Sequence, residues 1–150
     1  MSRQSNEPRM NEMIDMLKRS GLRVTPQRRA MCRTLARDTS HPTAQTIYER
    51  LKSEFPSLSL ATVYNTLQIL VDAGVIHEIG AAGDGAMHYD TDAALHVNLV
   101  CTNCGRIDDF HETTLQRVTQ SVTQHSGYQV RGARVAYYGL CPDCRKRLAS

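Results

Sequence analysis

The sequence predicts an α+β fold in which a helical N-terminal domain is followed by a smaller domain of mixed helix and strand. Apolar residues recur at helical spacing through most of the first 73 residues, whereas the second half combines short strand patterns with one helical pattern. Four of the five cysteines lie in that second half, as two Cys-x-x-Cys pairs. A length of 150 residues fits one or two small domains, and 41% hydrophobic content is enough to form a core.

Four helices are expected before residue 74. The second is marked by Thr25-Pro26, an N-cap residue followed by proline in the first turn, and the fourth begins behind the capping residue Ser59. Gly74 stands where a glycine commonly ends a helix. The expected ranges, in chain order, are 10–20, 26–37, 43–55 and 60–73.

Two short strands follow, over 75–79 and 86–90, joined by a loop that contains Gly80, Gly83 and Gly85. Helices followed by a glycine-joined hairpin describe a winged helix-turn-helix, in which the third and fourth helices form the turn motif and the hairpin is the wing. We therefore place a first domain at residues 1–90 and a second at 91–150, with a hinge at Thr91-Asp-Ala-Ala94.

The second domain is expected to hold three strands and one helix around the cysteine pairs. Strands are predicted over 95–100, 106–110 and 128–138, and a helix over 112–125. Each Cys-x-x-Cys pair then lies where a strand ends.

The four paired cysteines predict a closed structural zinc site. A Cys-x-x-Cys turn places two thiolates on one side of a tight loop, and two such turns complete a tetrahedral set that zinc favours. The ligands are Cys101, Cys104, Cys141 and Cys144. Two thioredoxin-like redox pairs, or buried cysteines without metal, are the alternatives.

A cationic segment predicts binding to nucleic acid. Residues 18–37 hold seven Lys and Arg and no Asp or Glu, a density that attracts phosphate, although a solvated helix face explains it too. Thr62, Tyr64 and Asn65 fall early in the fourth helix, where a major-groove helix contacts DNA. The first ten residues are polar and no run of 18 apolar residues occurs, so we expect a cytoplasmic protein with no membrane partner.

A second, mixed set of side chains predicts a further metal site. Alternation along a strand puts His96 and Asn98 on one face, and His41, Asp90 and Asp109 supply nitrogen and oxygen donors from elsewhere in the chain. Such donors suit Fe(II) or Mn(II), whereas by spacing alone each residue fits an ordinary polar surface residue better than a metal ligand.

Several segments resemble the ferric uptake regulator family, in the family's order and over nearly the whole chain. The segments are Leu22-Arg-Val-Thr-Pro-Gln-Arg28, His41-Pro-Thr-Ala44, Ser59-Leu-Ala-Thr-Val-Tyr-Asn65, His96-Val-Asn-Leu-Val-Cys-Thr-Asn-Cys-Gly105 and Tyr138-Gly-Leu-Cys-Pro-Asp-Cys144. The resemblance implies a winged-helix DNA-binding domain and a dimerisation domain that carries the four-cysteine zinc site. It also implies a regulatory Fe(II) or Mn(II) site between them, so that the metal closes a homodimer onto double-stranded operator DNA and usually represses transcription.

The resemblance also assigns residues. The regulatory ligands fall on His41, Asp90, His96, Asn98 and Asp109. DNA contacts are expected from two segments of the first domain, at Arg23, Thr25, Gln27, Arg28, Ser59, Ala61, Thr62, Tyr64 and Asn65.

Two of these positions point to a branch of the family. Peroxide-sensing members carry Asp where Asp90 and Asp109 stand, whereas iron-uptake members typically carry Glu there. Asn98 departs from the family's usual histidine, so the site either uses a weaker amide donor or is completed by a neighbour such as Asp92 or His88. The implied mechanism is oxidation of His41 and His96 by peroxide at bound iron, followed by loss of metal and of DNA binding.

Other functions fit the sequence less well. An iron- or manganese-responsive uptake repressor of the same family, without peroxide sensing, is the runner-up. A zinc deaminase requires His-x-Glu and Pro-Cys-x-x-Cys, and the chain has His77-Glu78, His111-Glu112 and Cys141-Pro142 instead. A zinc-ribbon interaction module would not need the basic helices or the wing. We therefore expect a regulator and no enzyme, with no small-molecule substrate beyond metal ions and peroxide.

Overall fold

A computed structural model describes residues 6–80, 84–92, 94–130 and 132–150. Contacts between residues divide the chain into two compact units, one formed by 1–80 with 87–93 and the other by 81–86 with 94–150. Gly83 of the expected wing loop and Ala93 of the expected hinge lie outside the described residues.

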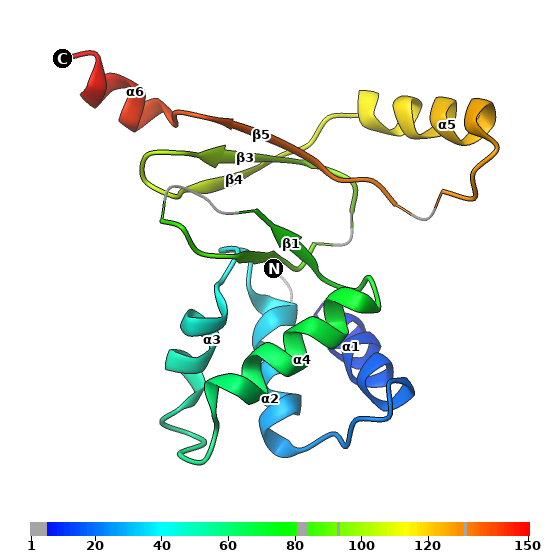
Figure 1. Ribbon diagram of the computed structural model, residues 1–150, viewed down its shortest axis with the longest axis vertical. Coiled ribbons are helices and arrows are strands. Elements are labelled where there is room, and N and C mark those ends of the chain that lie inside the picture. Colours follow the sequence, from blue (N-terminus) through cyan, green and yellow to red (C-terminus); the bar gives the residue numbers. More distant parts are fainter. Residues whose placement is uncertain (1–5, 81–83, 93, 131) are drawn as a thin grey trace. The chain divides into compact units, whose positions relative to one another are not determined.

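The first unit contains four helices, drawn from blue to green in Figure 1. Their bounds are α1 Glu7–Arg19, α2 Pro26–Arg37, α3 Ala44–Leu51 and α4 Leu60–Asp72. The Thr25 hydroxyl accepts a hydrogen bond from the Arg28 amide at 3.2 Å, and the Ser59 hydroxyl accepts one from the Thr62 amide at 3.1 Å. Both predicted N-caps are therefore confirmed.

One of the predicted helices is too long. α3 ends at Leu51 rather than at residue 55, and the next residues form a turn in which the Phe55 amide donates to the Leu51 carbonyl at 2.9 Å. The apolar side of α3 is already buried through Ile47 and Leu51, and Phe55 packs only partly against the core. The turn redirects the chain toward α4.

The core of the first unit lies among these helices. Its largest fully buried side chains come from all four of them and include Leu17, Met31, Leu35, Ile47 and Leu67. The strand pair that follows is β1 His77–Ile79 and β2 His88–Asp90, antiparallel, with Glu78 opposite Tyr89. Both strands are shorter than predicted, because only three residues of each find a partner across the hairpin.

The second unit is built on a three-stranded sheet in the order β4-β3-β5. Its elements are β3 Val97–Cys101, β4 Ile107–Phe110, α5 Thr114–Ser126, β5 Val135–Gly139 and α6 Pro142–Leu148. β3 pairs antiparallel with β4 and parallel with β5. The cysteine pairs follow β3 and β5, as expected.

Two predictions for the second unit are wrong. The strand predicted over 128–138 begins only at Val135, because β3 offers it five partners, from Val97 to Cys101. The helix α6 was not anticipated, although Cys141-Pro142 is the same capping pattern, N-cap followed by proline, as Thr25-Pro26.

The second unit exposes much of its apolar surface. α5 has no buried residue, although Val118 and Val122 lie at helical spacing along it, and they are 54% and 49% exposed. Other large apolar side chains of this unit are also exposed, among them Leu99, Phe110, Tyr128, Tyr137, Tyr138 and Leu140. In the described part of the chain, no helix is long and apolar enough to cross a membrane.

Candidate metal and DNA-binding sites

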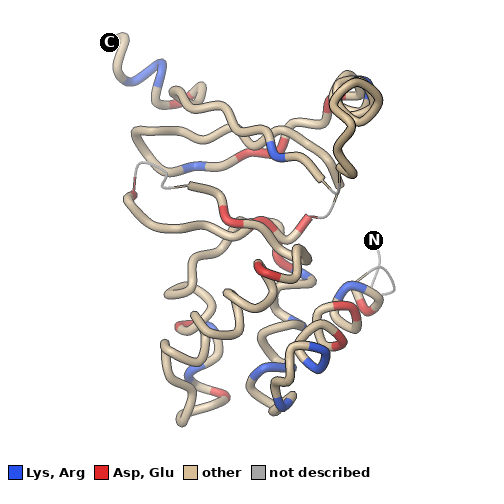
Figure 2. The backbone as a smooth tube through the Cα atoms, turned by 45° about the vertical axis from the view of Figure 1, so that its right-hand side comes forward, with Lys and Arg blue, Asp and Glu red and all other residues tan. Residues whose placement is uncertain are grey.

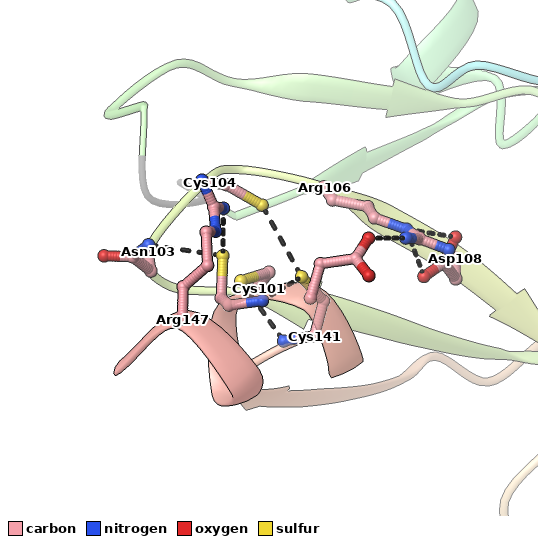
Figure 3. Close-up of polar contacts among 9 residues, drawn as sticks. Cys101, Asn103, Cys104, Arg106, Asp108, Cys141 and Arg147 are labelled. Carbon is pink, nitrogen blue, oxygen red and sulfur yellow. Dashed lines mark hydrogen bonds and ion pairs between the residues drawn. The ribbon is translucent and has the colours of Figure 1, made fainter. Parts of the chain in front are cut away.

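The four paired cysteines converge in the second unit. The end of β3 brings Cys101 and Cys104, the start of α6 brings Cys141 and Cys144, and their four sulfurs all lie within 4.8 Å of one another (Figure 3). The Sγ atoms of Cys104 and Cys141 are 3.8 Å apart. A tetrahedral site with metal–sulfur bonds of about 2.3 Å separates its sulfurs by about 3.8 Å, so the spacing fits zinc.

Hydrogen bonds prepare these sulfurs to be anionic. The Cys141 amide donates to Cys101 Sγ at 3.3 Å, and backbone amides lower the pKa of Cys101 to about 6. The pKa of Cys144 is lowered by the side chains of Asn103, which donates to its Sγ at 3.2 Å, and of Arg147, at 3.1 Å. The site therefore stabilises thiolates, the form that binds metal.

Four thiolates cannot gather in this way without a cation. The Arg106 amide lowers the pKa of Cys104, but hydrogen bonds shared with Cys101 and Cys144 outweigh it and raise that pKa to about 11. A divalent ion bound by the sulfurs would replace the proton on Cys104. The donor set and its spacing fit a closed structural zinc site, with no position left for water.

A second group of metal-binding side chains lies in the first unit. A ring nitrogen of His41 and a carboxylate oxygen of Asp90 lie within 4.8 Å of each other. Contacts between the loop before α3 and the strand β2 hold them there. The Tyr89 amide donates to the Pro42 carbonyl at 3.0 Å, and the Thr91 hydroxyl donates to the Asp38 carbonyl at 2.8 Å.

His41 itself has a backbone φ of 55°, in the left-handed region that residues other than glycine rarely adopt. Such backbone strain persists only where surrounding contacts hold it, and it is common at functional sites. The His41 carbonyl faces Nδ1 of His88 at 2.7 Å, which is one of those contacts.

The β3–β4 hairpin carries the remaining predicted ligands. Asn98 pairs with Asp109 across the hairpin, and Nε2 of His96 lies 3.3 Å from an Asp109 carboxylate oxygen. Nδ1 of His96 lies 2.7 Å from the Ala94 carbonyl. The prediction that His96 and Asn98 share a face agrees with the register, and the pairing of Asn98 with Asp109 adds Asp109 to that face. Asp92 and His88, the alternatives to Asn98, lie in the first unit, where the Asp92 amide donates to Asp90 Oδ1 at 2.9 Å.

Several residues expected at DNA lie at the start of α4. Ala61, Tyr64 and Asn65 are exposed, whereas Val63 and Leu67 on the opposite side are fully buried. Ser59 is the exposed N-cap, and its hydroxyl also lies 2.9 Å from that of Thr62. The helix thus presents a polar face while its apolar face packs into the core.

The other expected contacts surround the start of α2. Arg23 is exposed and its carbonyl accepts a hydrogen bond from the Arg28 guanidinium at 2.8 Å. Thr25 is the N-cap, and the Gln27 amide donates to the Ser57 hydroxyl at 2.9 Å, which ties the start of α2 to the turn before α4. Figure 2 shows Lys and Arg on the helices of this unit.

Sequence reasoning missed three supporting residues. Asn103 and Arg147 donate to Cys144, and Asp38 accepts hydrogen bonds from the Ser40 amide at 2.6 Å and from Arg50 beside the His41 loop. Asn103 lies inside a Cys-x-x-Cys pair, and Arg147 lies three residues after Cys144 on a helix. Their positions in the sequence could therefore have indicated that they contact the cysteine site. Asp38 and Arg50 are twelve residues apart and only the fold brings them together.

Comparison with known proteins identifies the family of this chain. The sequence profile of the ferric uptake regulator family matches residues 19–138. The peroxide operon regulator of Bacillus subtilis (strain 168) is 38% identical over 92% of this chain and 94% of its own length. Among solved structures, the Campylobacter jejuni peroxide stress regulator is 34% identical with a TM-score of 0.70, covering 87% of this chain and 98% of that one.

Another solved structure is that of PerR from Streptococcus pyogenes, a protein of peroxide sensing and gene regulation. It is 37% identical with a TM-score of 0.52, covering 91% of this chain and 92% of that one. The profile match spans most of the chain, and the relatives match over nearly their full length. The chain therefore belongs to the ferric uptake regulator family.

Proposed function

We propose that this protein is a metal-dependent transcriptional repressor that responds to peroxide. The observation that carries the proposal is its similarity, over nearly the whole chain, to a peroxide operon regulator and to peroxide stress regulators. The two groups of nitrogen and oxygen donors described above support it, because repression that depends on metal requires a second metal site besides the thiolate cluster. The protein would act in the cytoplasm.

In this proposal the two parts of the chain have different functions. Residues 1–90 bind double-stranded operator DNA through the polar face of α4 and the start of α2, and residues 91–150 form a homodimer. The exposed apolar side chains of α5 and of the sheet support dimer formation, because monomeric proteins rarely leave such patches uncovered. A symmetric dimer would present two copies of α4 to two half-sites of an operator.

The two kinds of metal ion have different roles in this proposal. Zn2+ bound by Cys101, Cys104, Cys141 and Cys144 stabilises the second unit. Fe2+ or Mn2+ is held by the mixed donors His41, Asp90, His96, Asn98 and Asp109, whose carboxylate, amide and imidazole groups suit these ions better than four thiolates would. Ligands from both parts of the chain would couple metal occupancy to DNA binding, because the metal favours the conformation in which all of them are engaged.

Peroxide would reverse repression by damaging this second site. Fe2+ held by these donors would supply the one-electron chemistry that activates hydrogen peroxide, which Mn2+ supplies poorly. In the net reaction the imidazole of His41 or His96 would lose two electrons and gain one oxygen atom of the peroxide, and the other oxygen would leave as water. The oxidised ring would be a weaker ligand, so the metal would be released. Without metal, the DNA-binding conformation would no longer be favoured over the others.

The proposal is tested by DNA binding under defined metal conditions. Duplexes are first selected from a random pool by Mn2+-loaded protein, and the affinity for the selected duplex is then measured by fluorescence anisotropy. We expect tight binding with Mn2+ or Fe2+, loss of binding with a chelator, and loss on adding peroxide with Fe2+ only. Metal-dependent binding that ignores peroxide with both metals would favour an iron- or manganese-responsive uptake repressor instead. Failure to select any duplex would contradict both functions.

A further inference from the structure

The face of the β3–β4 hairpin that carries His96 also carries His111. In the antiparallel ladder Val97 pairs with Phe110 and Asn98 with Asp109, so one step further toward the open end sets residue 96 opposite residue 111. Side chains alternate between the faces of a strand, which places His96, Asn98, Asp109 and His111 on a single face.

The two imidazoles on this face are close neighbours. The ring centroids of His96 and His111 are 5.5 Å apart, with 47° between the ring planes. Two imidazoles that share a metal ion, with metal–nitrogen bonds of about 2.1 Å, hold their centroids about 5 Å apart. The observed separation therefore needs little adjustment for both rings to bind one ion. His111 is exposed, so its side chain has room to make that adjustment.

The contacts of His96 indicate where the ion belongs. Its Nδ1 lies 2.7 Å from the Ala94 carbonyl and donates to it, which leaves Nε2 with a lone pair when the ring is neutral. That nitrogen lies 3.3 Å from a carboxylate oxygen of Asp109. A divalent cation beside both atoms turns two facing acceptors into two ligands, and a backbone carbonyl on the other ring nitrogen is the usual support of a ligating histidine.

We propose that His111 is a ligand of the regulatory metal ion, on the same hairpin face as His96 and Asp109. The inference rests on the proposed function, because it concerns the same Fe2+ or Mn2+ site. Asn98 can offer only an amide oxygen, a weaker donor than imidazole for these ions. With His111 the second unit contributes two imidazoles and a carboxylate, and the site no longer depends on Asn98.

The test uses the full-length protein with its zinc in place and Mn2+ as the probe. Mn2+ affinity is measured by calorimetry, and pulsed electron paramagnetic resonance counts the imidazole nitrogens coupled to the bound ion. His111→Ala is compared with His125→Ala, a matched variant in which an exposed histidine is removed from α5, where its Nδ1 contacts Ser121 one turn earlier on the same helix. Asn98→His in the His111→Ala background returns an imidazole to the same face.

We expect His111→Ala to weaken Mn2+ binding about tenfold or more and to remove one coupled imidazole, while zinc content stays unchanged. His125→Ala should leave both measurements unchanged, and the Asn98→His change should restore both. If His111→Ala binds Mn2+ like His125→Ala while His41→Asn loses binding, the role of His111 is refuted and the proposed function stands. If the wild-type chain binds no Mn2+, or if binding is unaffected by His41→Asn, the proposed function fails as well.

Discussion

At the scale of single residues, the proposed metal donors of the first unit depend on one strained loop. His41 has a φ of 55°, and the loop around it is held through Asp38, Pro42 and the strand β2. A ligand fixed in this way needs less ordering when metal arrives, which favours tight binding. The cost of the backbone conformation, about 1–2 kcal/mol for a residue with a Cβ atom, is carried by those surrounding contacts.

His41 can be tested without disturbing that backbone. Asparagine tolerates the left-handed region, so His41→Asn removes the imidazole and leaves the loop conformation accessible. We expect Mn2+-dependent DNA binding to be lost, while zinc content and dimerisation, measured by elemental analysis and light scattering, stay as in the wild type. His125→Asn serves as the control. Retention of metal-dependent binding in His41→Asn would exclude this residue from the site.

Asp38 predicts a dependence of stability on pH. Burial tends to raise the pKa of its carboxyl, but hydrogen bonds from Ser40 and Arg50 outweigh it, so the pKa lies below the usual value. A carboxylate with a lowered pKa stabilises the folded state above its unfolded pKa of about 4, and this contribution is lost as pH falls through the folded value.

Asp38→Asn should therefore lower the free energy of unfolding by about 2 kcal/mol at pH 7, and by less at pH 3, which is below the unfolded pKa and where the contribution of the carboxylate is being lost. Urea denaturation followed by helical circular dichroism measures both values. Asp15→Asn, an exposed change on α1, should have little effect at either pH. An equal loss of stability at both pH values in Asp38→Asn would show that the charge of Asp38 is not what stabilises the loop.

At the scale of elements, α4 divides its surface between the core and the proposed DNA interface. Tyr64 is 51% exposed, whereas Leu67, three residues later, is fully buried. Tyr64→Ala should therefore weaken binding to the selected duplex by about tenfold or more while leaving the melting temperature nearly unchanged. Leu67→Ala should instead cost about 2–5 kcal/mol of stability. Anisotropy and thermal denaturation separate the two effects, and a Tyr64→Ala variant with wild-type affinity would exclude this face from the interface.

The elements show how far local sequence could predict the fold. Helix starts were predictable because Thr25 and Ser59 cap them through their own side chains, a local interaction. Strand lengths were not, because they depend on partners distant in sequence. The length of β5 is limited by the five residues of β3 that pair with it. The strand pattern that begins at Tyr128 contains no information about the length of that partner strand.

The candidate sites follow the same division. The thiolate cluster was predictable because two local turns supply all four sulfurs. The hairpin partners of His96 required the register of β3 against β4, which is set only by the fold. The sequence alone therefore does not connect His111 with the site, and its position across the hairpin from His96 is what indicates a role there.

At the scale of the whole molecule, the described residues of the second unit form little apolar core. Few of their apolar side chains are buried, Val97 and Val100 among them, while their aromatic residues are mostly exposed. In the proposed function, bound zinc and contact with a second copy of the chain stabilise this unit. Bound structural zinc contributes about 10 kcal/mol or more to folding in small domains, so the cluster should be essential to this unit.

Removing one thiolate should test this dependence. We expect Cys101→Ala to lose zinc, unfold the second unit and dissociate the dimer, as seen by elemental analysis, nuclear magnetic resonance and light scattering. Cys32→Ala is the matched control, because Cys32 is fully buried in the first unit and burial raises its pKa to about 12, which makes it a packed thiol rather than a metal ligand. A folded, dimeric Cys101→Ala protein would contradict a structural role for the cluster.

In the proposed function, peroxide acts through iron bound by this protein's own histidines. Intact-mass and peptide mass spectrometry on anaerobically Fe2+-loaded protein, before and after peroxide and beside a Mn2+-loaded control, measures that directly. We predict one added oxygen atom at His41 or His96, in the Fe2+-loaded sample alone. Oxidation confined to methionine or cysteine, or equal with both metals, would contradict the claim and leave a metal-responsive repressor that does not sense peroxide.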